Sequence, residues 1–359
     1  MKSQKKNDFK EGINWYGWTT PFSGYGVVTL EYIVAINKLI GDKLSVGWQR
    51  QEPSKSQEFS ILTKDQRYLV SQKPYQKERL GICKVTPEYF YVNESDIKIG
   101  YTMVENTRVG DKWVKTINGM NACLVPSKYL VNVFKESGIT IPVYPVRQGI
   151  NPKLYPYFER KKKDKFIFGT CGWLDERKNW KEMCIAFASE FSDDEPVELW
   201  LKNSNNTFGF EQPEDPRIKF IDELWDFKQM NKFYQDLDCF LFCTRAEGAG
   251  MPAREAMATG CPVILTNWGG LADICDPKYN FPVDPVAVDL PDYRGDEQPG
   301  FQARIDVQEI MYWMRYAYEN WKESMARGKA ASEWMHKEWT WEKCAEEVVE
   351  LLQKEFQYE

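Results

Sequence analysis

The sequence predicts an α/β protein of two domains, with a parallel sheet that helices cover on both faces. Its 359 residues are enough for two cores of ordinary size, and the 43% hydrophobic content can fill them. Residues 149–165 are rich in proline and charge and lack both helical and alternating periodicity, so they mark a boundary between domains. Beyond this boundary, short apolar runs alternate with helical patterns, which is typical of a parallel sheet.

The first domain begins with a strand, a glycine turn and a helix. Residues 13–18 form the apolar run of the strand, and residues 27–39 have helical spacing. Gly24 and Gly26 lie in the turn between them, where glycine lets the backbone approach a ligand closely. Glycines are ordinary in turns, so this pattern alone does not establish a binding site.

The second domain has a well-specified helix in its first βα unit. Hydrophobic residues recur every three or four positions between 180 and 191, which predicts one buried stripe. Asn179 and Glu182 have the spacing of a capping box, which predicts where this helix starts. The other expected elements are strands at 166–171, 197–201, 218–221, 239–243 and 262–265, and a helix at 224–237.

Residues 247–264 combine two carboxylates with a glycine loop between two expected strands. Pro252 lies where the first turn of a helix tolerates a missing N–H, and Gly260 lies where the helix must stop. Backbone N–H groups and the positive end of a helix dipole would face the mouth of the sheet, with Glu247 on the loop and Glu255 in the first turn. This pattern predicts a site for a ligand that is anionic and rich in hydroxyls. The simpler alternative is a βαβ turn with ordinary helix-start carboxylates.

The loop at residues 172–179 places two cations beside the start of a helix. Arg177 and Lys178 could neutralise a diphosphate there together with the backbone N–H groups. The alternative is that both are solvated loop residues. Lys202, at the end of the next strand, is a third candidate for the same role.

Composition and charge argue against several other classes of protein. The net charge of −6 argues against a general affinity for polyanions, because neutralising many phosphates requires a concentrated basic surface. No apolar run approaches the ~18 residues of a membrane span, and the N-terminus lacks the apolar core of a signal peptide. Nine scattered cysteines favour free, buried thiols in a reducing cytoplasm over disulfides or a zinc cluster.

The chain has one local acidic pair, and two local basic clusters that run against the negative net charge. The carboxylates of Asp236 and Asp238 superficially resemble a metal-binding pair, but we expect them to be solvated or capping residues and predict no metal site. The two basic clusters are expected to be a frayed tail and a solvated linker, each able to touch an anionic acceptor or membrane surface. They comprise Lys2, Lys5, Lys6 and Lys10 at the N-terminus, and residues 160–165.

The string at residues 247–264 closely resembles the signature of retaining glycosyltransferases of family 4. In that signature a Glu-Gly-x-Gly loop leads to a second Glu, then Ala-Met-Ala, a Gly and Pro-Val-Ile. The resemblance implies the GT-B fold, in which two Rossmann-like domains face each other across a cleft and a C-terminal helix crosses back to the first domain. The expected boundaries are 1–153 for an acceptor-side domain, 164–335 for a nucleotide-sugar domain and 336–359 for the helix.

The same resemblance implies an activity and roles for individual residues. The expected reaction moves a sugar from a nucleotide diphosphate sugar to an acceptor hydroxyl, with retention at the anomeric carbon and with no metal or cofactor besides the donor. The acceptor would be a glycan, a lipid-linked molecule or another hydroxyl compound. Glu247, Lys178 and Arg177 would act in catalysis, and the donor would contact Glu255, Gly248, Ala249, Gly250, Met251, Pro252, Gly24, Gly26 and Lys202.

The sequence departs from the family pattern at two places. Trp173 occupies the position of a usual arginine, so we hypothesise that Arg177 supplies the missing charge. Many members also have a histidine in the first domain, whereas the single histidine here, His336, is expected at the surface or in packing. Glu105 or Arg108 could take a polar role near the sugar, with a structural salt bridge as the alternative.

Three other functions remain compatible with the sequence. A nucleotide-sugar epimerase can share the GT-B architecture. A glycosyltransferase acting on modified bases in DNA would explain the short chain and the basic clusters. A non-catalytic sugar-nucleotide binding module would explain Trp173 and the absent histidine.

Overall fold

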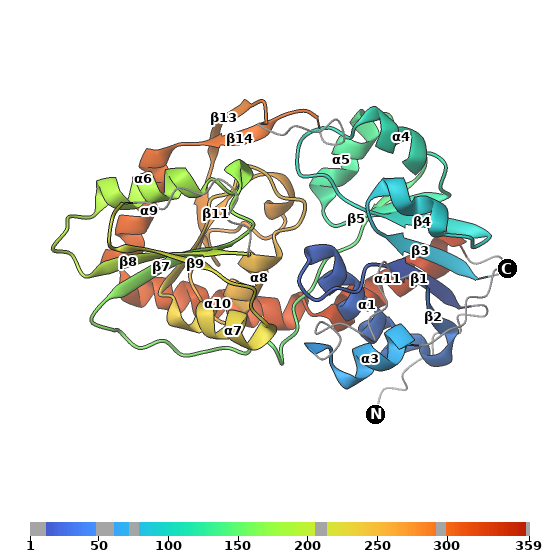
Figure 1. Ribbon diagram of the computed structural model, residues 1–359, viewed down its shortest axis with the longest axis horizontal. Coiled ribbons are helices and arrows are strands. Elements are labelled where there is room, and N and C mark those ends of the chain that lie inside the picture. The colour runs from blue at the N-terminus through green and yellow to red at the C-terminus, as the bar shows by residue number, and fades with distance from the viewer. Residues whose placement is uncertain (1–11, 48–60, 72–78, 205–213, 292–298, 357–359) are drawn as a thin grey trace. The chain divides into compact units, whose positions relative to one another are not determined.

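The chain forms two compact units, and each unit is made of more than one stretch of the sequence. The structure, a computed structural model, describes residues 12–47, 61–71, 79–204, 214–291 and 299–356 (Figure 1). Unit 1 contains the chain up to Met103, the stretch Val109–Gly149 and the residues from Trp339 onward. Unit 2 contains Val104–Arg108 and Ile150–Glu338. The N-terminal lysine cluster lies outside the described residues.

Unit 1 is built on a six-stranded parallel sheet with the order β2-β1-β3-β4-β5-β6. Its core strands are buried along their whole length, as expected for strands covered by helices on both faces. Its elements are β1 (Ile13–Gly17), α1 (Gly24–Ile40), β2 (Leu44–Gly47), α3 (Lys64–Ser71), β3 (Leu80–Lys84), η3 (Pro87–Val92), β4 (Ile97–Tyr101), α4 (Asp111–Ile117), β5 (Ala122–Val125), α5 (Lys128–Glu136), β6 (Val143–Pro145) and α11 (Trp341–Phe356).

Unit 2 repeats this plan with the strand order β12-β11-β10-β7-β8-β9, again all parallel. Helices α6 and α9 lie on one face of the sheet, and α7, α8 and α10 on the other (Figure 1). A separate antiparallel pair joins β13 and β14. The elements are β7 (Phe166–Gly172), η4 (Glu176–Lys178), α6 (Trp180–Glu190), β8 (Val197–Asn203), β9 (Ile218–Asp222), α7 (Phe227–Asp236), β10 (Cys239–Phe242), α8 (Met251–Ala258), β11 (Val263–Thr266), η5 (Gly269–Leu271), β12 (Phe281–Val283), β13 (Pro285–Asp289), β14 (Gln302–Ile305), α9 (Val307–Glu319) and α10 (Trp321–Glu338).

The predicted α/β class is therefore confirmed in both units. Each sheet also has one point where the strand order changes direction, between β1 and β3 in unit 1 and between β7 and β10 in unit 2. At such a switch point the two connections leave toward opposite sides, which opens a crevice at the carboxyl ends of the strands where ligands bind in open α/β sheets. The strand order alone thus predicts two places for ligand binding, one in each unit.

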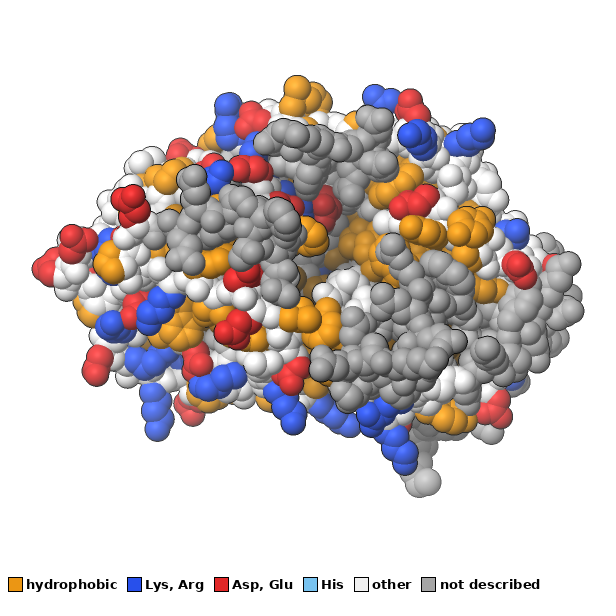
Figure 2. All heavy atoms as spheres, viewed as in Figure 1, with side chains coloured by type: hydrophobic (Ala, Val, Ile, Leu, Met, Phe, Trp, Pro, Cys, Tyr) orange, Lys and Arg blue, Asp and Glu red, His pale blue; other side chains and the backbone are white. Residues whose placement is uncertain are grey.

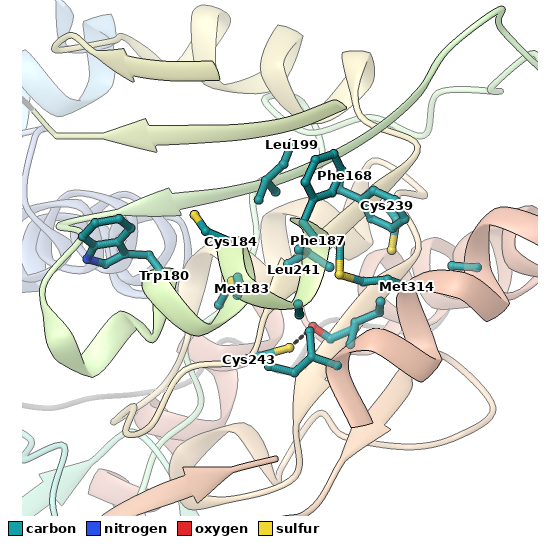
Figure 3. Packing of buried hydrophobic residues seen from close by; sticks show 14 of the residues in the cluster. Phe168, Trp180, Met183, Cys184, Phe187, Leu199, Cys239, Leu241, Cys243 and Met314 are labelled. Carbon is teal, nitrogen blue, oxygen red and sulfur yellow. Dashed lines mark hydrogen bonds between the residues drawn. The ribbon is translucent and has the colours of Figure 1, made fainter. Parts of the chain in front are cut away.

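The core of unit 2 contains the predicted stripe of α6. Met183, Cys184 and Phe187 pack toward Phe168, Leu199 and Leu241 of the sheet, with Met314 of α9 beside them, while the Trp180 ring lies to one side at the start of α6 (Figure 3). All nine cysteines of the chain are free thiols, and all but Cys275 are buried. Cys239 begins the buried strand β10 and Cys243 directly follows it, and both serve as small apolar side chains in this core.

The predicted capping box at Asn179 and Glu182 is wrong. Asn179 does precede α6, but its backbone is left-handed, with φ of 57°, and its side chain makes no capping hydrogen bond. Asn179 is both the last cap of the short helix η4 and the first cap of α6. Its backbone therefore lacks the extended geometry that a capping side chain requires. A capping box is present instead at α7, between Asp226 and Gln229, and this helix consequently starts three residues later than predicted.

The basic stretch at residues 160–165 is only partly the solvated linker that we expected. Arg160 is buried in unit 2, where its guanidinium donates hydrogen bonds to the carbonyls of Tyr234 at 2.6 Å and of Leu237 and Thr259 at 2.9 Å. Lys163 pairs with Asp238 at 3.2 Å. Arg160 therefore links the C-terminal ends of α7 and α8, where carbonyl groups without partners in the helix accept hydrogen bonds from a cation.

The C-terminal helix α11 packs in unit 1, and it begins at Trp341 rather than at the predicted residue 336. The Trp341 ring contacts the Tyr32 ring at a centroid distance of 5.1 Å, and Gly149 leaves room for the backbone at Trp341. His336 belongs to the preceding helix, α10, and its Nε2 atom lies 3.0 Å from the carbonyl oxygen of Tyr155, so it is a packing residue of unit 2. In the part of the chain that the structure describes, no helix is both long and apolar enough to cross a membrane.

Candidate active site

Three buried, charged side chains meet at the switch point of unit 2. Oε1 of Glu247 lies 2.7 Å from Nη1 of Arg177 and 2.5 Å from Nζ of Lys178. Arg177 and Lys178 form η4 after the carboxyl end of β7, and Glu247 lies in the loop after β10. We call these three residues the switch-point cluster. The two cations are buried, so the alternative that they are solvated loop residues is wrong.

The local backbone explains why adjacent residues can point to one carboxylate. Gly172 has φ of +139°, and a Cβ atom there would lie 3.1 Å from Cε of Lys178. Asp175 accepts a hydrogen bond from the backbone N–H of Lys178, and the left-handed Asn179 ends the turn. The carbonyl of Arg177 accepts from the N–H of Arg245 at 2.8 Å, which ties the loop after β7 to the loop after β10. Asparagine tolerates the left-handed region better than most residues do.

The charges of the cluster are extended by a second carboxylate. Glu105 lies 3.0 Å from Nε of Arg177, and the segment that carries it belongs to unit 2. Burial opposes ionisation of Glu247, but Lys178 and Arg177 outweigh it and lower the pKa of this carboxyl. Burial raises the pKa of Glu105, and the charge of Glu247 adds to this effect. Glu247 is thus the carboxylate that holds its charge between the two cations.

The glycine loop between Glu247 and α8 is tightly constrained. Gly250 has φ of +75°, and a Cβ atom there would lie 2.1 Å from Cδ2 of Leu271. A Cβ atom at Gly270 would lie 2.0 Å from the carbonyl oxygen of Gly248, so two backbone segments pass in direct contact. Ala249 is buried, and its carbonyl accepts a hydrogen bond from the guanidinium of Arg254. The loop therefore has one rigid shape that leads directly into the N-terminus of α8, at Met251 and Pro252.

Glu255 lies on α8 and is held by a tyrosine from α7. The hydroxyl of Tyr234 donates to Oε2 of Glu255 at 2.8 Å and lies 3.5 Å from Sγ of Cys171. Burial raises the pKa of Tyr234 well above its ordinary value, so this hydroxyl keeps its proton and remains a donor. Cys171, in β7, interacts electrostatically with Glu255, Lys202 and Lys178.

Lys202 and Trp173 differ in their surroundings. Lys202 is buried near the end of β8, with its Nζ atom 5.2 Å from the centre of the Trp225 ring, and burial lowers its pKa. It makes no hydrogen bond or ion pair with any residue that the structure describes. Trp173 is 59% exposed and carries no charge into the cluster. Arg177, which shares a carboxylate oxygen with Lys178, is the second cation at this place.

Gly24 and Gly26 lie in unit 1, in the first turn of α1. Ser23 caps this helix by accepting a hydrogen bond from the N–H of Gly26 at 3.1 Å. A Cβ atom at Gly26 would lie 1.9 Å from the carbonyl oxygen of Thr20, whereas one at Gly24 would meet nothing within 4 Å. Gly26 is thus required by the turn, and Gly24 is open on its outer side.

The acidic residues Asp238 and Glu105 both lie in ion pairs. Asp238 lies before β10, at the amino edge of the sheet, where its Oδ2 accepts from the N–H of Ile167 at 2.9 Å. This carboxylate is buried, so the expectation of a solvated or capping residue is wrong for Asp238, while Asp236 pairs with Lys232. Glu105 forms its ion pair with Arg177 and so joins the candidate site.

Sequence reasoning missed Tyr234 and the ring of Phe242, whose centre lies 4.9 Å from Nζ of Lys178. Tyr234 occupies an inward position of a helical pattern, which indicates burial but no partner. Phe242 is the last residue of a buried strand that the sequence predicted, and its place beside Lys178 depends on the strand order, which a single sequence does not reveal.

Comparisons with known proteins agree with this geometry. Residues 165–289 match the family model described as glycosyl transferases group 1. The chain is 28% identical over 157 residues to the capsular polysaccharide biosynthesis glycosyltransferase CapM of Staphylococcus aureus, covering 40% of each protein. It is 20% identical over 219 residues to uncharacterized protein 356 of Sulfolobus islandicus rod-shaped virus 1, covering 53% of this chain and 60% of that protein. The matches thus span less than two thirds of these relatives.

Two solved structures are similar over nearly the whole chain. Anabaena HepE in complex with UDP and glucose superposes with a TM-score of 0.69 and 13% identity, covering 96% of this chain and all of that one. WaaG, a glycosyltransferase involved in lipopolysaccharide biosynthesis, gives a TM-score of 0.64 and 13% identity, covering 94% and 99%. The predicted GT-B type of fold is confirmed by this similarity. The stretch that matches the group 1 glycosyltransferase model, residues 165–289, contains the switch-point cluster.

Proposed function

We propose that the protein is a retaining glycosyltransferase of family 4, which moves a sugar from a nucleotide diphosphate sugar to an acceptor hydroxyl. The observation that carries the proposal is the convergence of Arg177 and Lys178 on one oxygen of Glu247 at the switch point of unit 2. Two adjacent, buried cations are costly unless an anion is present, and a diphosphate offers several anionic oxygens to replace the protein carboxylate.

The chief barrier to transfer is the departure of the nucleotide diphosphate. Negative charge grows on the leaving oxygen, and donors fixed beforehand in a buried site stabilise that charge strongly. Lys178, Arg177 and the N-terminus of α8 would supply this stabilisation. Arg177 would stand in for the arginine that the family has at the position of Trp173, because its guanidinium shares the Glu247 oxygen with Lys178.

The two glutamates would have separate tasks in this reaction. Once the diphosphate takes over the cations, Glu247 and the N–H groups from Gly248 to Met251 would orient the sugar. Glu255, which Tyr234 holds in place at 2.8 Å, would accept hydrogen bonds from the ribose hydroxyls. We assign retention to attack on the same face that the leaving group departs from, so neither glutamate acts as a glycosidase acid or nucleophile.

The proposal extends to what the enzyme requires and where it acts. The reaction would need no metal or cofactor besides the donor, because the protein's own cations meet the leaving charge. The acceptor would be a glycan, a lipid-linked molecule or another hydroxyl compound, and the enzyme would act in the cytoplasm. UDP-sugars are the first donors to test, since HepE is described in complex with UDP and glucose.

A thermal-shift screen against nucleotide diphosphate sugars tests the donor half of the proposal. A ligand that binds only the folded form raises the melting temperature. At a free ligand concentration of about 100 times Kd, it adds about 2.7 kcal/mol to the free energy of unfolding. The best donor is then incubated with a panel of hydroxyl acceptors, and the anomeric configuration of the product is read by NMR. An inverted anomeric centre, or no stabilisation by any donor, would contradict the proposal.

The same assay separates the alternatives. Isomerised donor in the absence of acceptor would indicate an epimerase, and tight donor binding without turnover would indicate a binding module. Salt-sensitive binding of duplex DNA would indicate a DNA-modifying enzyme. On the face shown in Figure 2, Lys and Arg side chains over unit 2, on the left, lie among Asp and Glu side chains and are most numerous toward the lower edge.

A further inference from the structure

Lys84 is a fully buried cation at the other switch point of the molecule. It is the last residue of β3, its side chain has 0% exposure, and its Nζ atom makes no hydrogen bond or ion pair with the residues that the structure describes. Two aromatic faces take the place of an anion. Nζ lies 3.7 Å from the centre of the Tyr25 ring and 4.4 Å from the centre of the Tyr101 ring.

Such a position is costly for an ammonium group. A buried charge is ordinarily paired or hydrogen-bonded, and contact with aromatic faces offsets only part of the desolvation. Burial accordingly lowers the pKa of Lys84 to about 7. The titratable groups that face it are Tyr25 from α1, Tyr101 from β4 and Cys123 from β5, and burial raises the pKa of the Cys123 thiol to about 12. The thiol is therefore neutral and does not balance the lysine charge.

The place of Lys84 in the sheet is where topology prepares a ligand site. Its register partner on β1 is Gly17, directly before the loop that leads to Gly24 and Gly26, and its partner on β4 is Tyr101. In open α/β sheets ligands bind at the carboxyl ends of the two strands between which the order reverses, and in unit 1 these strands are β1 and β3. The corresponding place in unit 2 carries two cations and a carboxylate, whereas unit 1 has a cation for which the described chain supplies no anion.

We propose that Lys84 binds an anionic substituent, a phosphate or a carboxylate, on the saccharide acceptor. This inference rests on the proposed function, because it assigns the crevice of unit 1 to the acceptor. An anionic oxygen forms a charge-assisted hydrogen bond with the amine, which a neutral sugar hydroxyl cannot match in a buried site.

Tyr25 is the group that must turn aside for the ligand to reach Lys84. It lies in the first turn of α1, is partly exposed, and its hydroxyl lies 3.2 Å from Oγ1 of Thr102. Tyr101 is fully buried and belongs to the sheet, so it stays in place behind the amine. The bound oxyanion would take the place of the Tyr25 ring and accept a hydrogen bond from the ammonium group of Lys84.

Calorimetric titration of the full chain with three small saccharides tests this inference. Glucose 6-phosphate and glucuronate differ from glucose by one anionic group, and the two anionic arms distinguish phosphate from carboxylate. We expect at least one of them to bind at least about tenfold more tightly than glucose, and Lys84→Met to remove this preference. Lys115→Met removes a lysine charge from the exposed side of α4 in the same unit and should keep the preference.

UDP binding is measured in the same samples to keep the two proposals apart. If UDP fails to bind, the proposed function fails. If UDP binds and the wild type shows no preference, or Lys84→Met retains it, the inference about Lys84 is overturned. Should Lys84→Met not fold, the wild type decides alone, because glucuronate keeps its charge between about pH 6 and about pH 8 while the amine loses its proton. Its affinity must fall over that range, and a constant affinity would refute the inference.

Discussion

The Nζ atom of Lys178 lies 2.5 Å from Oε1 of Glu247, and both side chains are buried at the carboxyl ends of β7 and β10. In this state the lysine is neutralised by the protein itself. A diphosphate that binds here must compete with Glu247 for the lysine, so the affinity for nucleotide and the charge of the carboxylate are linked. The first two predictions follow from this competition.

Replacing Lys178 by Met should lower the turnover of sugar transfer by about a hundredfold or more, the usual cost of losing one donor to a developing oxyanion. The loss arises because Arg177 alone remains to stabilise the leaving diphosphate. Steady-state measurement of kcat with the best donor checks this. Lys181→Met is the matched control, since Lys181 lies one turn further on and is exposed beside Glu176. Equal turnover in Lys178→Met and wild type would contradict the assignment.

Replacing Glu247 by Gln should separate binding from turnover. Removal of the carboxylate leaves two cations without their partner, which should destabilise the free protein by about 3 kcal/mol. The freed cations should bind UDP and inorganic pyrophosphate more tightly than in the wild type, while sugar transfer falls. Melting temperatures with and without pyrophosphate measure the first effect, and kcat the second. A variant that binds pyrophosphate more weakly than the wild type would show that Glu247 does not compete with the ligand.

Replacing Tyr234 by Phe should weaken donor binding without changing chemistry. The hydroxyl that orients Glu255 is lost, so the KM for the donor should rise by about fivefold while kcat changes by less than about twofold. A double-mutant cycle with Glu255→Gln isolates this interaction, because the two changes should be less than additive. Additive effects would mean that Tyr234 acts independently of Glu255.

Replacing Gly250 by Ala should destabilise unit 2 by about 1–3 kcal/mol, because the left-handed backbone and the Leu271 side chain leave no room for a Cβ atom. Gly24→Ala provides the contrast, since a Cβ atom there meets nothing within 4 Å. Its unfolding free energy should stay within about 0.5 kcal/mol of the wild type. Urea unfolding of both variants checks the prediction, and equal stabilities would exclude a rigid glycine loop.

Lys84 should make the protein more stable as the pH rises through neutrality. Its pKa is about 7 in the folded chain, against an ordinary lysine value of 10.5, so the unfolded chain binds more protons above about pH 7. The free energy of unfolding should therefore increase by up to about 1 kcal/mol between about pH 7 and about pH 8, below the range where unfolded thiols ionise. Lys84→Met should lack this increase when both proteins are unfolded by urea at each pH. The same slope in both would show that Lys84 is not the group responsible.

Much of the fold and of the site could be predicted from local pattern. The strands of unit 2, the stripe of α6 and the block from Glu247 to Gly260 are encoded by apolar spacing and by residues with narrow backbone preferences. The capping box was misplaced because Asn179 has the right spacing to Glu182 but lies between two helices, and spacing does not report the backbone angle that such a junction needs.

The contacts that complete the site could not be predicted in the same way. Tyr234 contacts Glu255, which is 21 positions later in the sequence, and Glu105 contacts Arg177, which is 72 positions later. Such pairs depend on the order of strands in the sheet. Lys84 gave no signal at all, since a lysine at the end of an apolar run is ordinarily expected to reach solvent.

The placement of α11 in unit 1 has a consequence for biosynthesis. Every residue of unit 2 leaves the ribosome before Trp341, so the contact between Trp341 and Tyr32 in unit 1 forms only after the chain of unit 2 has been made. The nascent chain can therefore close the core of unit 2 while unit 1, although started first, still lacks its final helix. Translation completes the two units in the reverse of the order in which it begins them.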